Sequence, residues 1–383
     1  MKNNSINDNT LGYIEGYYGR ILSWDQRRLI VNSLKKNKMN TYLYAPKEDE
    51  KHRFIWRQRY NNEWRSHFRT FTEYCKNSKV NVIAGIAPGL DFNFNNLIHG
   101  NVRKKNSDFI SLYNKAQQLL GDGASSIALL LDDIPENFRA KFGKKISEGT
   151  IHGILANKLS ESLNQNIYFV PRIYADELSR NEPSYLKDLS IILNPEINVF
   201  YSGKYVVSKN LTNYKKIFKV LNNKIIFWDN YYANDYCPRR LFIGPHIGRE
   251  KLKNIMINPT GLINTDLLIL DLFANNLNNN HSNKEWLKTL NDHNVPIIFN
   301  KVKKFFLKPN FGANPILNSL QVKPTHIETL EFLLWRWKGE LSREWYPFLF
   351  GLKQDLQLYQ NSLTFERLVK TQTTPLSKYV NKI

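Results

Sequence analysis

Two aspartates stand side by side in the sequence at the end of an apolar run. Residues 129–131 are three leucines that read as the end of a buried strand, and Asp132 and Asp133 follow directly in "LLLDDIPENF". Such a pair is often a solvated turn in which one aspartate caps the next segment. Because adjacent strand residues point to opposite sides, the two carboxylates could instead approach a substrate from two directions. The rest of the sequence has to decide between these interpretations.

Short β-rich runs alternate with helical stretches over most of the chain, so the pair belongs to a repeating pattern. The runs that predict strands are "YIEG" (13–16), "MNTYLYAP" (39–46), "VNVIAGIAPG" (80–89), "SIALLLDD" (126–133), "IYFVPRIY" (167–174), "INVFYSG" (197–203), "KIIFWDN" (224–230) and "NIMINPTG" (254–261). Helices are predicted between most of them, over 23–38 with Ser23 as the cap, around 62–78 and around 106–121. About eight strand–helix units predict an α/β fold, a (β/α)8 TIM barrel. The alternative, a doubly wound open sheet, normally stops at five or six strands, and no GxGxxG motif follows the first strand.

The rhythm changes beyond residue 281. Segments such as "NKEWLKTLNDH" (283–293) and "FERLVK" (365–370) have helical spacing, and "LKPNFGANP" (307–315) is typical of a connection between helices. We therefore expect a barrel domain over 1–281 and a C-terminal all-helical domain over 282–383. The aromatic residues of the second domain are expected to pack between helices, and the alternative is that they line a groove. These residues are Trp335, Trp337, Trp345 and Tyr346.

Composition and charge narrow the class of protein. The net charge is +20, but lysines and arginines are spread along the chain, so we expect a basic solvated surface without a dedicated nucleic-acid site. The two cysteines, Cys75 and Cys237, have no zinc-like spacing, which favours a reducing compartment. The polar start "MKNNSINDNT" and the lack of a run of about 18 apolar residues argue against a secretory signal and a membrane span. A soluble, cytoplasmic protein is expected.

The predicted strand ends carry polar and aromatic side chains. In a barrel of this type, chemistry gathers where the strands end. No histidine pair has metal-ligand spacing, no phosphate-binding GK[ST] loop occurs, and there is no GxSxG motif, so no metal or cofactor is expected. Carboxylates, amides, an amine and aromatic rings are groups that hold sugar hydroxyls and cleave glycosidic bonds. The residues at these ends include Gly16, Lys47, Asp132, Asp133, Tyr174, the stretch 228–236 and Asn258.

Several blocks resemble one known family in residue type and order. The blocks "EGYYGR", "NTYLYAPKED" with "KHR" after it, "APGLD", "ALLLDDI", "WDNYYANDY" and "NP" are similar to the signature blocks of glycoside hydrolase family 84, the O-GlcNAcases and related β-N-acetylglucosaminidases. The resemblance runs from about Leu11 to about Pro259 and so covers nearly the whole predicted barrel. Three blocks depart from it: "PRIY", "YSGK" and "KED" stand where the family more often has Pro-Thr-Glu-Tyr, Trp-Thr-Gly-Pro and Lys-Asp-Asp.

The resemblance implies a role for each of these residues. Asp132 would orient the substrate's acetamido N–H, and Asp133 would be the general acid and base, so the sugar's own acetamido oxygen is the nucleophile. A neighbouring pair suits these roles, because the charge of one carboxylate disfavours ionisation of the other. The other residues would form the sugar pocket. Those expected to hold hydroxyls are Gly16, through its carbonyl, Lys47, Asn230, Asp235 and Asn258, while Tyr174 and Trp228 would wall the acetamido group.

The same resemblance implies a function and partners. It implies a retaining β-N-acetylglucosaminidase that removes β-linked GlcNAc from serine or threonine of proteins through an oxazoline intermediate. One alternative is the same chemistry on a glycan or cell-wall fragment, and another is a non-catalytic basic protein that binds nucleic acid or a glycan. The expected partner is a GlcNAc-bearing protein or glycan, with neither nucleic acid nor membrane, and the helical domain could pair two copies of the chain.

Overall fold

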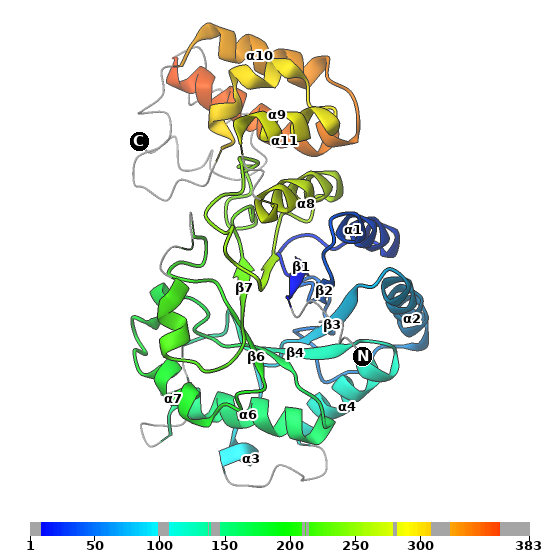
Figure 1. Ribbon diagram of the computed structural model, residues 1–383, viewed down its shortest axis with the longest axis vertical. Helices are drawn as coiled ribbons and strands as arrows, with labels where there is room; N and C mark the ends of the chain where they lie inside the picture. The colour runs from blue at the N-terminus through cyan, green and yellow to red at the C-terminus, as the bar shows by residue number, and fades with distance from the viewer. Residues whose placement is uncertain are drawn as a thin grey trace, which may run out of the picture. The chain divides into compact units, whose positions relative to one another are not determined.

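Eight parallel strands form a closed barrel in the computed structural model (Figure 1). The structure describes residues 9–98, 107–136, 138, 146–208, 211, 214–278, 282–307 and 322–360. Each strand pairs with the next in the chain, and the last pairs with the first, with Leu11 opposite Ile255. The strands are β1 (Leu11–Glu15), β2 (Thr41–Tyr44), β3 (Asn81–Ile86), β4 (Ser126–Leu130), β5 (Tyr168–Val170), β6 (Asn198–Tyr201), β7 (Ile225–Asp229) and β8 (Ile255–Ile257). The predicted (β/α)8 barrel is confirmed, and the open sheet is excluded.

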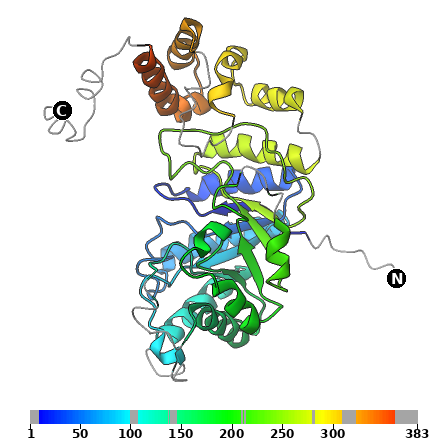
Figure 2. The ribbon, with the colours of Figure 1, turned by 90° about the vertical axis from the view of Figure 1, so that its left-hand side faces the viewer.

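Helices surround the barrel and cover the outer faces of the strands. They are α1 (Trp24–Lys36), α2 (Asn62–Asn77), α3 (Asn95–Ile98), α4 (Asp108–Gly121), α6 (Glu148–Leu163), α7 (Tyr185–Ile192) and α8 (Ile263–Leu277), with the 3-10 helices η1 (Asp176–Ser179) and η2 (Tyr214–Lys219). The first begins at the predicted cap, because Ser23 and Gln26 form a reciprocal capping box. Helices α1 and α8, from the two ends of the barrel sequence, lie side by side (Figures 1 and 2).

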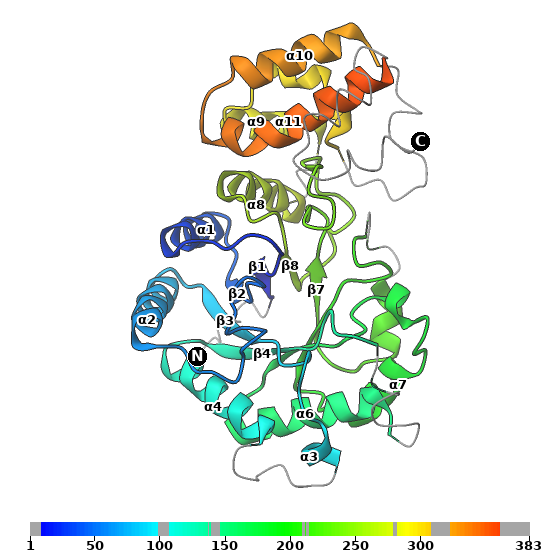
Figure 3. The ribbon, with the colours of Figure 1, turned by 180° about the vertical axis from the view of Figure 1, so that it is seen from behind.

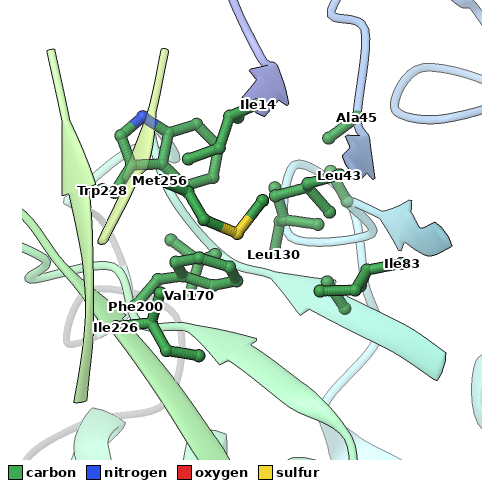
Figure 4. Packing of buried hydrophobic residues seen from close by; sticks show 12 residues of the cluster. Ile14, Leu43, Ala45, Ile83, Leu130, Val170, Phe200, Ile226, Trp228 and Met256 are labelled. Atoms are coloured by element: carbon green, nitrogen blue, oxygen red, sulfur yellow. The ribbon is translucent and has the colours of Figure 1, made fainter. Parts of the chain in front are cut away.

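Alternate residues of the strands fill the barrel interior. Side chains such as Leu43, Leu130, Phe200 and Met256 meet along the barrel axis and are fully buried (Figure 4). Trp228 lies in the same cluster, packed edge-on against Phe200 with ring centroids 5.7 Å apart. Because side chains alternate with a period of two, the residue two positions beyond the last core residue of a strand also faces the barrel axis. This register decides which side chains line the mouth of the barrel.

The chain divides into two compact units: Met1–Asp235 with His246–Asn280, and Tyr236–Pro245 with His281–Ile383. The second unit contains α9 (Asn283–Asp292), η3 (Ile297–Lys301), η4 (Lys303–Phe305), α10 (Pro324–Trp335) and α11 (Glu340–Tyr359) (Figure 3). Ile243 joins the 236–245 segment to these helices: its N–H donates to the Phe306 carbonyl at 2.9 Å, and its carbonyl accepts from Trp286 Nε1 at 2.7 Å. This segment precedes residue 281, the predicted domain boundary.

The four aromatic residues singled out in the helical unit divide into two pairs. Trp345 and Trp337 are buried and pack against each other edge-on, with ring centroids 5.4 Å apart, as expected of helix packing. Trp335 of α10 and Tyr346 of α11 are exposed, but they also meet edge-on between the two helices, with ring centroids 6.0 Å apart. The predicted helix 365–370 and all but the first residue of 307–315 lie outside the described residues. No helix within the described ranges is long and apolar enough to cross a membrane.

Candidate active site

The mouth of the barrel is lined by polar residues that lie two positions beyond a core residue. Gly16 follows the core residue Ile14, and Asp132 follows Leu130, in each case by two positions. Lys47, Asn230 and Asn258 stand in the same relation to other core residues, Ala45, Trp228 and Met256. All five are buried. The barrel register therefore brings residues from five strand ends to one place.

Asp132 lies in this buried layer and pairs with the amine that follows β2. The Lys47 ammonium donates to Asp132 Oδ2 at 2.5 Å, and the two residues are 2% and 5% exposed. The other carboxylate oxygen, Oδ1, is buried and has no hydrogen-bond partner among the described residues. A buried carboxylate with an open acceptor position is suited to receive an N–H donor from a bound molecule.

Asp133 faces a different environment from its neighbour. Its backbone has φ = 50°, in the left-handed region, and its side chain is exposed. The Tyr18 hydroxyl donates to Oδ2 at 2.9 Å, and the Tyr174 hydroxyl donates to Oδ1 at 2.8 Å. Burial, and then the charge of Asp133, raise the pKa of both tyrosines, so both hydroxyls remain protonated donors. One aspartate is therefore enclosed, while the other is held near solvent by two phenols.

An amide network joins the ends of β1, β7 and β8. Asn230 Oδ1 accepts from Trp228 Nε1 and from Asn258 Nδ2, both at 2.9 Å. Asn258 Oδ1 in turn accepts from the Gly16 N–H at 3.2 Å. A Cβ at Gly16 would lie 2.6 Å from the Trp228 ring, so the close approach of indole and backbone requires glycine here. The indole and both amides thus have fixed orientations.

Asp235 is linked to Asp133 through Tyr18. Its Oδ2 accepts the Tyr18 N–H at 3.1 Å, and the side chain is half-buried. Tyr18 therefore contacts Asp235 with its backbone and Asp133 with its hydroxyl. The hydrogen bonds thus form two groups. The Asp132–Asp133 peptide and Tyr18 join one group, which contains Lys47, Asp132, Asp133, Tyr174 and Asp235. The amide network forms the other, which contains Gly16, Trp228, Asn230 and Asn258.

The end of β7 is fixed by a buried charge cluster. Asp229, between Trp228 and Asn230, accepts from His246 Nε2 at 2.8 Å and from Arg249 Nε at 2.9 Å. Although burial opposes ionisation, Arg249 and His246 hold the pKa of the Asp229 carboxyl below its usual range. The paired Asp229 carboxylate therefore fixes the end of β7, which carries Trp228 and Asn230.

Two residues of this site were not singled out from the sequence. Tyr18 stands in "EGYYGR", two positions after Gly16, and Arg53 stands in "KHR", six positions after Lys47. Arg53 donates to the backbone carbonyls of Asp132 and Asp133, at 3.4 and 2.7 Å. Their place inside the resembling blocks was the only available signal, because both contacts join segments far apart in the chain.

The chemistry that this arrangement can perform follows from its groups. A buried carboxylate with an open oxygen and a second carboxylate beside phenol donors can orient one group and exchange a proton with another. An indole and several amides can hold a sugar ring by its apolar face and its hydroxyls. Among the described residues, no three His, Cys, Asp or Glu side chains are grouped as a metal ion would need.

Comparisons with known proteins concern both the family and the fold. The family described as beta-N-acetylglucosaminidase matches residues 11–305. The protein O-GlcNAcases of Rattus norvegicus and Mus musculus are 33% and 32% identical over 262 residues, which is 65% of this chain. The matched region spans only 28% of each of these longer relatives. A solved structure, that of a mutant of the Thermobaculum terrenum O-GlcNAc hydrolase, has a TM-score of 0.71 at 23% identity and covers 94% of this chain and 86% of that one.

Proposed function

The chain belongs to the β-N-acetylglucosaminidase family, and from this membership we propose that it is a retaining glycoside hydrolase that removes β-linked GlcNAc from serine or threonine of proteins. The observation that carries the proposal is the pair of consecutive carboxylates in two environments. Asp132 is buried and paired with Lys47. Asp133 is exposed and accepts hydrogen bonds from the hydroxyls of Tyr18 and Tyr174. The names of the rat and mouse relatives support a protein-linked sugar as the substrate.

In the first step the sugar supplies its own nucleophile. Asp132, through its open Oδ1, accepts the acetamido N–H, which makes the acetamido carbonyl oxygen more nucleophilic. That oxygen forms a bond with the anomeric carbon as the glycosidic C–O bond breaks, and Asp133 gives its proton to the leaving oxygen. The products of this step are a free serine or threonine hydroxyl and a protonated oxazoline, whose N–H stays hydrogen-bonded to the Asp132 carboxylate.

In the second step water completes the cycle. Asp133, now an anion, takes a proton from water, whose oxygen forms a bond with the anomeric carbon as the oxazoline C–O bond breaks. The two displacements each invert the anomeric carbon, so the configuration is retained. Exposure of Asp133 supports this dual role, because it must exchange a proton with the leaving group and then with water.

The remaining residues hold the ring. The Gly16 carbonyl, Lys47, Asn230, Asp235 and Asn258 bind ring hydroxyls in this proposal, and Tyr174 and Trp228 wall the acetamido group. The buried position of the amides supports specific hydroxyl recognition, because a sugar lacking one hydroxyl would leave an amide unpaired. Cys75 and Cys237 form no disulfide, which supports action in a reducing compartment such as the cytoplasm.

Hydrolysis of an aryl β-N-acetylglucosaminide, with and without EDTA, tests this proposal. Asp133→Asn should lower kcat/KM about 10²- to 10⁴-fold, and Asp132→Asn about 10²- to 10³-fold. The matched control is Asp271→Asn, a surface aspartate that binds Lys36, and this variant should keep full activity. A GlcNAc-bearing peptide then tests the natural aglycone against a chitobiose-type glycan. A folded wild type with no turnover of either kind of substrate would refute the enzymatic proposal.

A further inference from the structure

Arg53 lies directly behind the aspartate pair, on the loop that follows β2. Its side chain is buried, with 4% exposure. Nη2 donates to the Asp133 carbonyl at 2.7 Å, and Nη1 lies 3.4 Å from the Asp132 carbonyl. The forked guanidinium thus spans two consecutive backbone carbonyls, a geometry that its planar set of donors allows and a lysine ammonium does not reproduce.

Burial of this cation needs an explanation, because charged side chains are seldom enclosed without an anion. Other buried arginines of the chain follow the usual pattern: Arg27 pairs with Glu15 at 2.8 Å, and Arg249 pairs with Asp229 at 2.9 Å. Within the described ranges Arg53 has no carboxylate within ion-pair distance, and both hydrogen bonds of its side chain go to the backbone of the aspartate pair. Its charge is therefore directed at the peptide groups that carry the two carboxylates.

The two bonds act on the backbone angles of Asp133. The Asp132 carbonyl belongs to the peptide plane before the Asp133 α-carbon, and the Asp133 carbonyl belongs to the plane after it. Fixing both planes fixes φ and ψ of the residue between them. Asp133 has φ = 50°, which residues with a side chain rarely adopt, so an extended backbone is the competing state.

The direction of the Asp133 side chain depends on this backbone state. In the left-handed state its carboxylate reaches the hydroxyls of Tyr18 and Tyr174 at 2.9 and 2.8 Å, while Asp132 stays in the buried layer with Lys47. A return to extended backbone would turn the Asp133 carboxylate away from these donors.

We propose that Arg53 is a positioning residue that holds Asp133 in the left-handed conformation and thereby aims its carboxylate at the glycosidic oxygen. This inference rests on the proposed function, because it assigns Arg53 to the proton transfer assigned above to Asp133. Arg53 touches no substrate in this account. Its removal impairs proton donation, and it leaves attack by the acetamido oxygen in place.

The test measures how the rate depends on the leaving group. A series of aryl β-N-acetylglucosaminides, from dinitrophenyl to methoxyphenyl, is hydrolysed by the wild type and by Arg53→Lys, Arg53→Gln and Arg53→Met. Activated dinitrophenolate leaves without a proton, whereas methoxyphenolate needs one. We expect kcat to fall about 10- to 100-fold for the methoxyphenyl substrate, to change little for the dinitrophenyl substrate, and KM to stay nearly constant.

Arg57 gives a matched control from the same loop. It pairs with Asp91 and Asp108 outside the site, and Arg57→Lys should keep the leaving-group dependence of the wild type. Folding of each variant is checked by far-UV circular dichroism and thermal unfolding.

An equal loss of rate on all substrates, or unchanged rates, would overturn the inference while leaving the proposed function intact. If none of the three Arg53 variants folds, Arg53 belongs to the folding core and the inference is wrong. An inactive wild type would refute the proposed function itself.

Discussion

Lys47 and Asp132 form a buried ion pair, with Nζ and Oδ2 2.5 Å apart and both side chains almost completely enclosed. The pair joins the loop after β2 to the end of β4, which are 85 residues apart in the sequence. A buried charge that loses its partner is far less stable than the intact pair. Lys47 thus holds Asp132 Oδ2 inside the barrel mouth and leaves Oδ1 as the open acceptor that the proposed contact with an acetamido N–H requires.

A double-mutant cycle on this pair separates stability from activity. Lys47→Met leaves the Asp132 carboxylate buried without its cation and should lower the free energy of unfolding by about 3–5 kcal/mol. Adding Asp132→Asn removes the unpaired charge and should restore most of that stability, while hydrolysis stays impaired in both variants. Urea unfolding and aryl glycoside kinetics on the same preparations measure the two effects. Full activity of the double variant would contradict the role given to Asp132.

Gly16→Ala should damage the sugar pocket through the indole. The added methyl carbon would lie 2.6 Å from Trp228, so the ring must shift and its hydrogen bond to Asn230 is strained. We expect a loss of about 1–3 kcal/mol in unfolding free energy, with a raised KM for the aryl glycoside. Gly121→Ala is the control, because no atom lies within 4 Å of a Cβ added there. If Gly16→Ala and Gly121→Ala had the same unfolding free energy and the same KM, the present position of the Trp228 ring would not be needed for stability or for substrate binding.

Much of the site could be predicted from the sequence, because strand periodicity is local. Alternation predicted a carboxylate on the barrel side, and Asp132 lies buried there, two positions after Leu130. The exposed direction of Asp133 instead comes from its left-handed backbone, with φ = 50°, which alternation does not predict. Tyr18 and Arg53 were missed, because their contacts with Asp133 span 115 and 80 residues and depend on loop conformations that no local pattern encodes. The segment 236–245 is a similar case, since its grouping with the helical unit depends on distant partners such as Phe306.

Two buried histidines predict how stability depends on pH. Burial lowers the pKa of His52 and of His152 to about 3, from an ordinary value near 6.5. His52 Nδ1 lies 2.9 Å from the Gly85 carbonyl, and His152 Nδ1 lies 2.8 Å from the Tyr185 hydroxyl, so both rings are held as neutral imidazoles. The Glu148 carboxylate lies 3.9 Å from His152 Nε2, too far for a hydrogen bond, and it is already paired with Arg172.

The sign of the effect follows from proton binding. Between pH 6.5 and about 3 the unfolded chain binds protons at these positions and the folded chain does not, so stability falls as the pH falls through this window. Each histidine contributes a slope of up to about 1.4 kcal/mol per pH unit. Urea unfolding at pH 7, 6, 5 and 4 should therefore give a flatter slope for His152→Gln, which keeps an acceptor for Tyr185, than for the wild type. The exposed His67, changed to Gln, is the control. An unchanged slope for His152→Gln would show that His152 binds its proton equally in the folded and the unfolded chain.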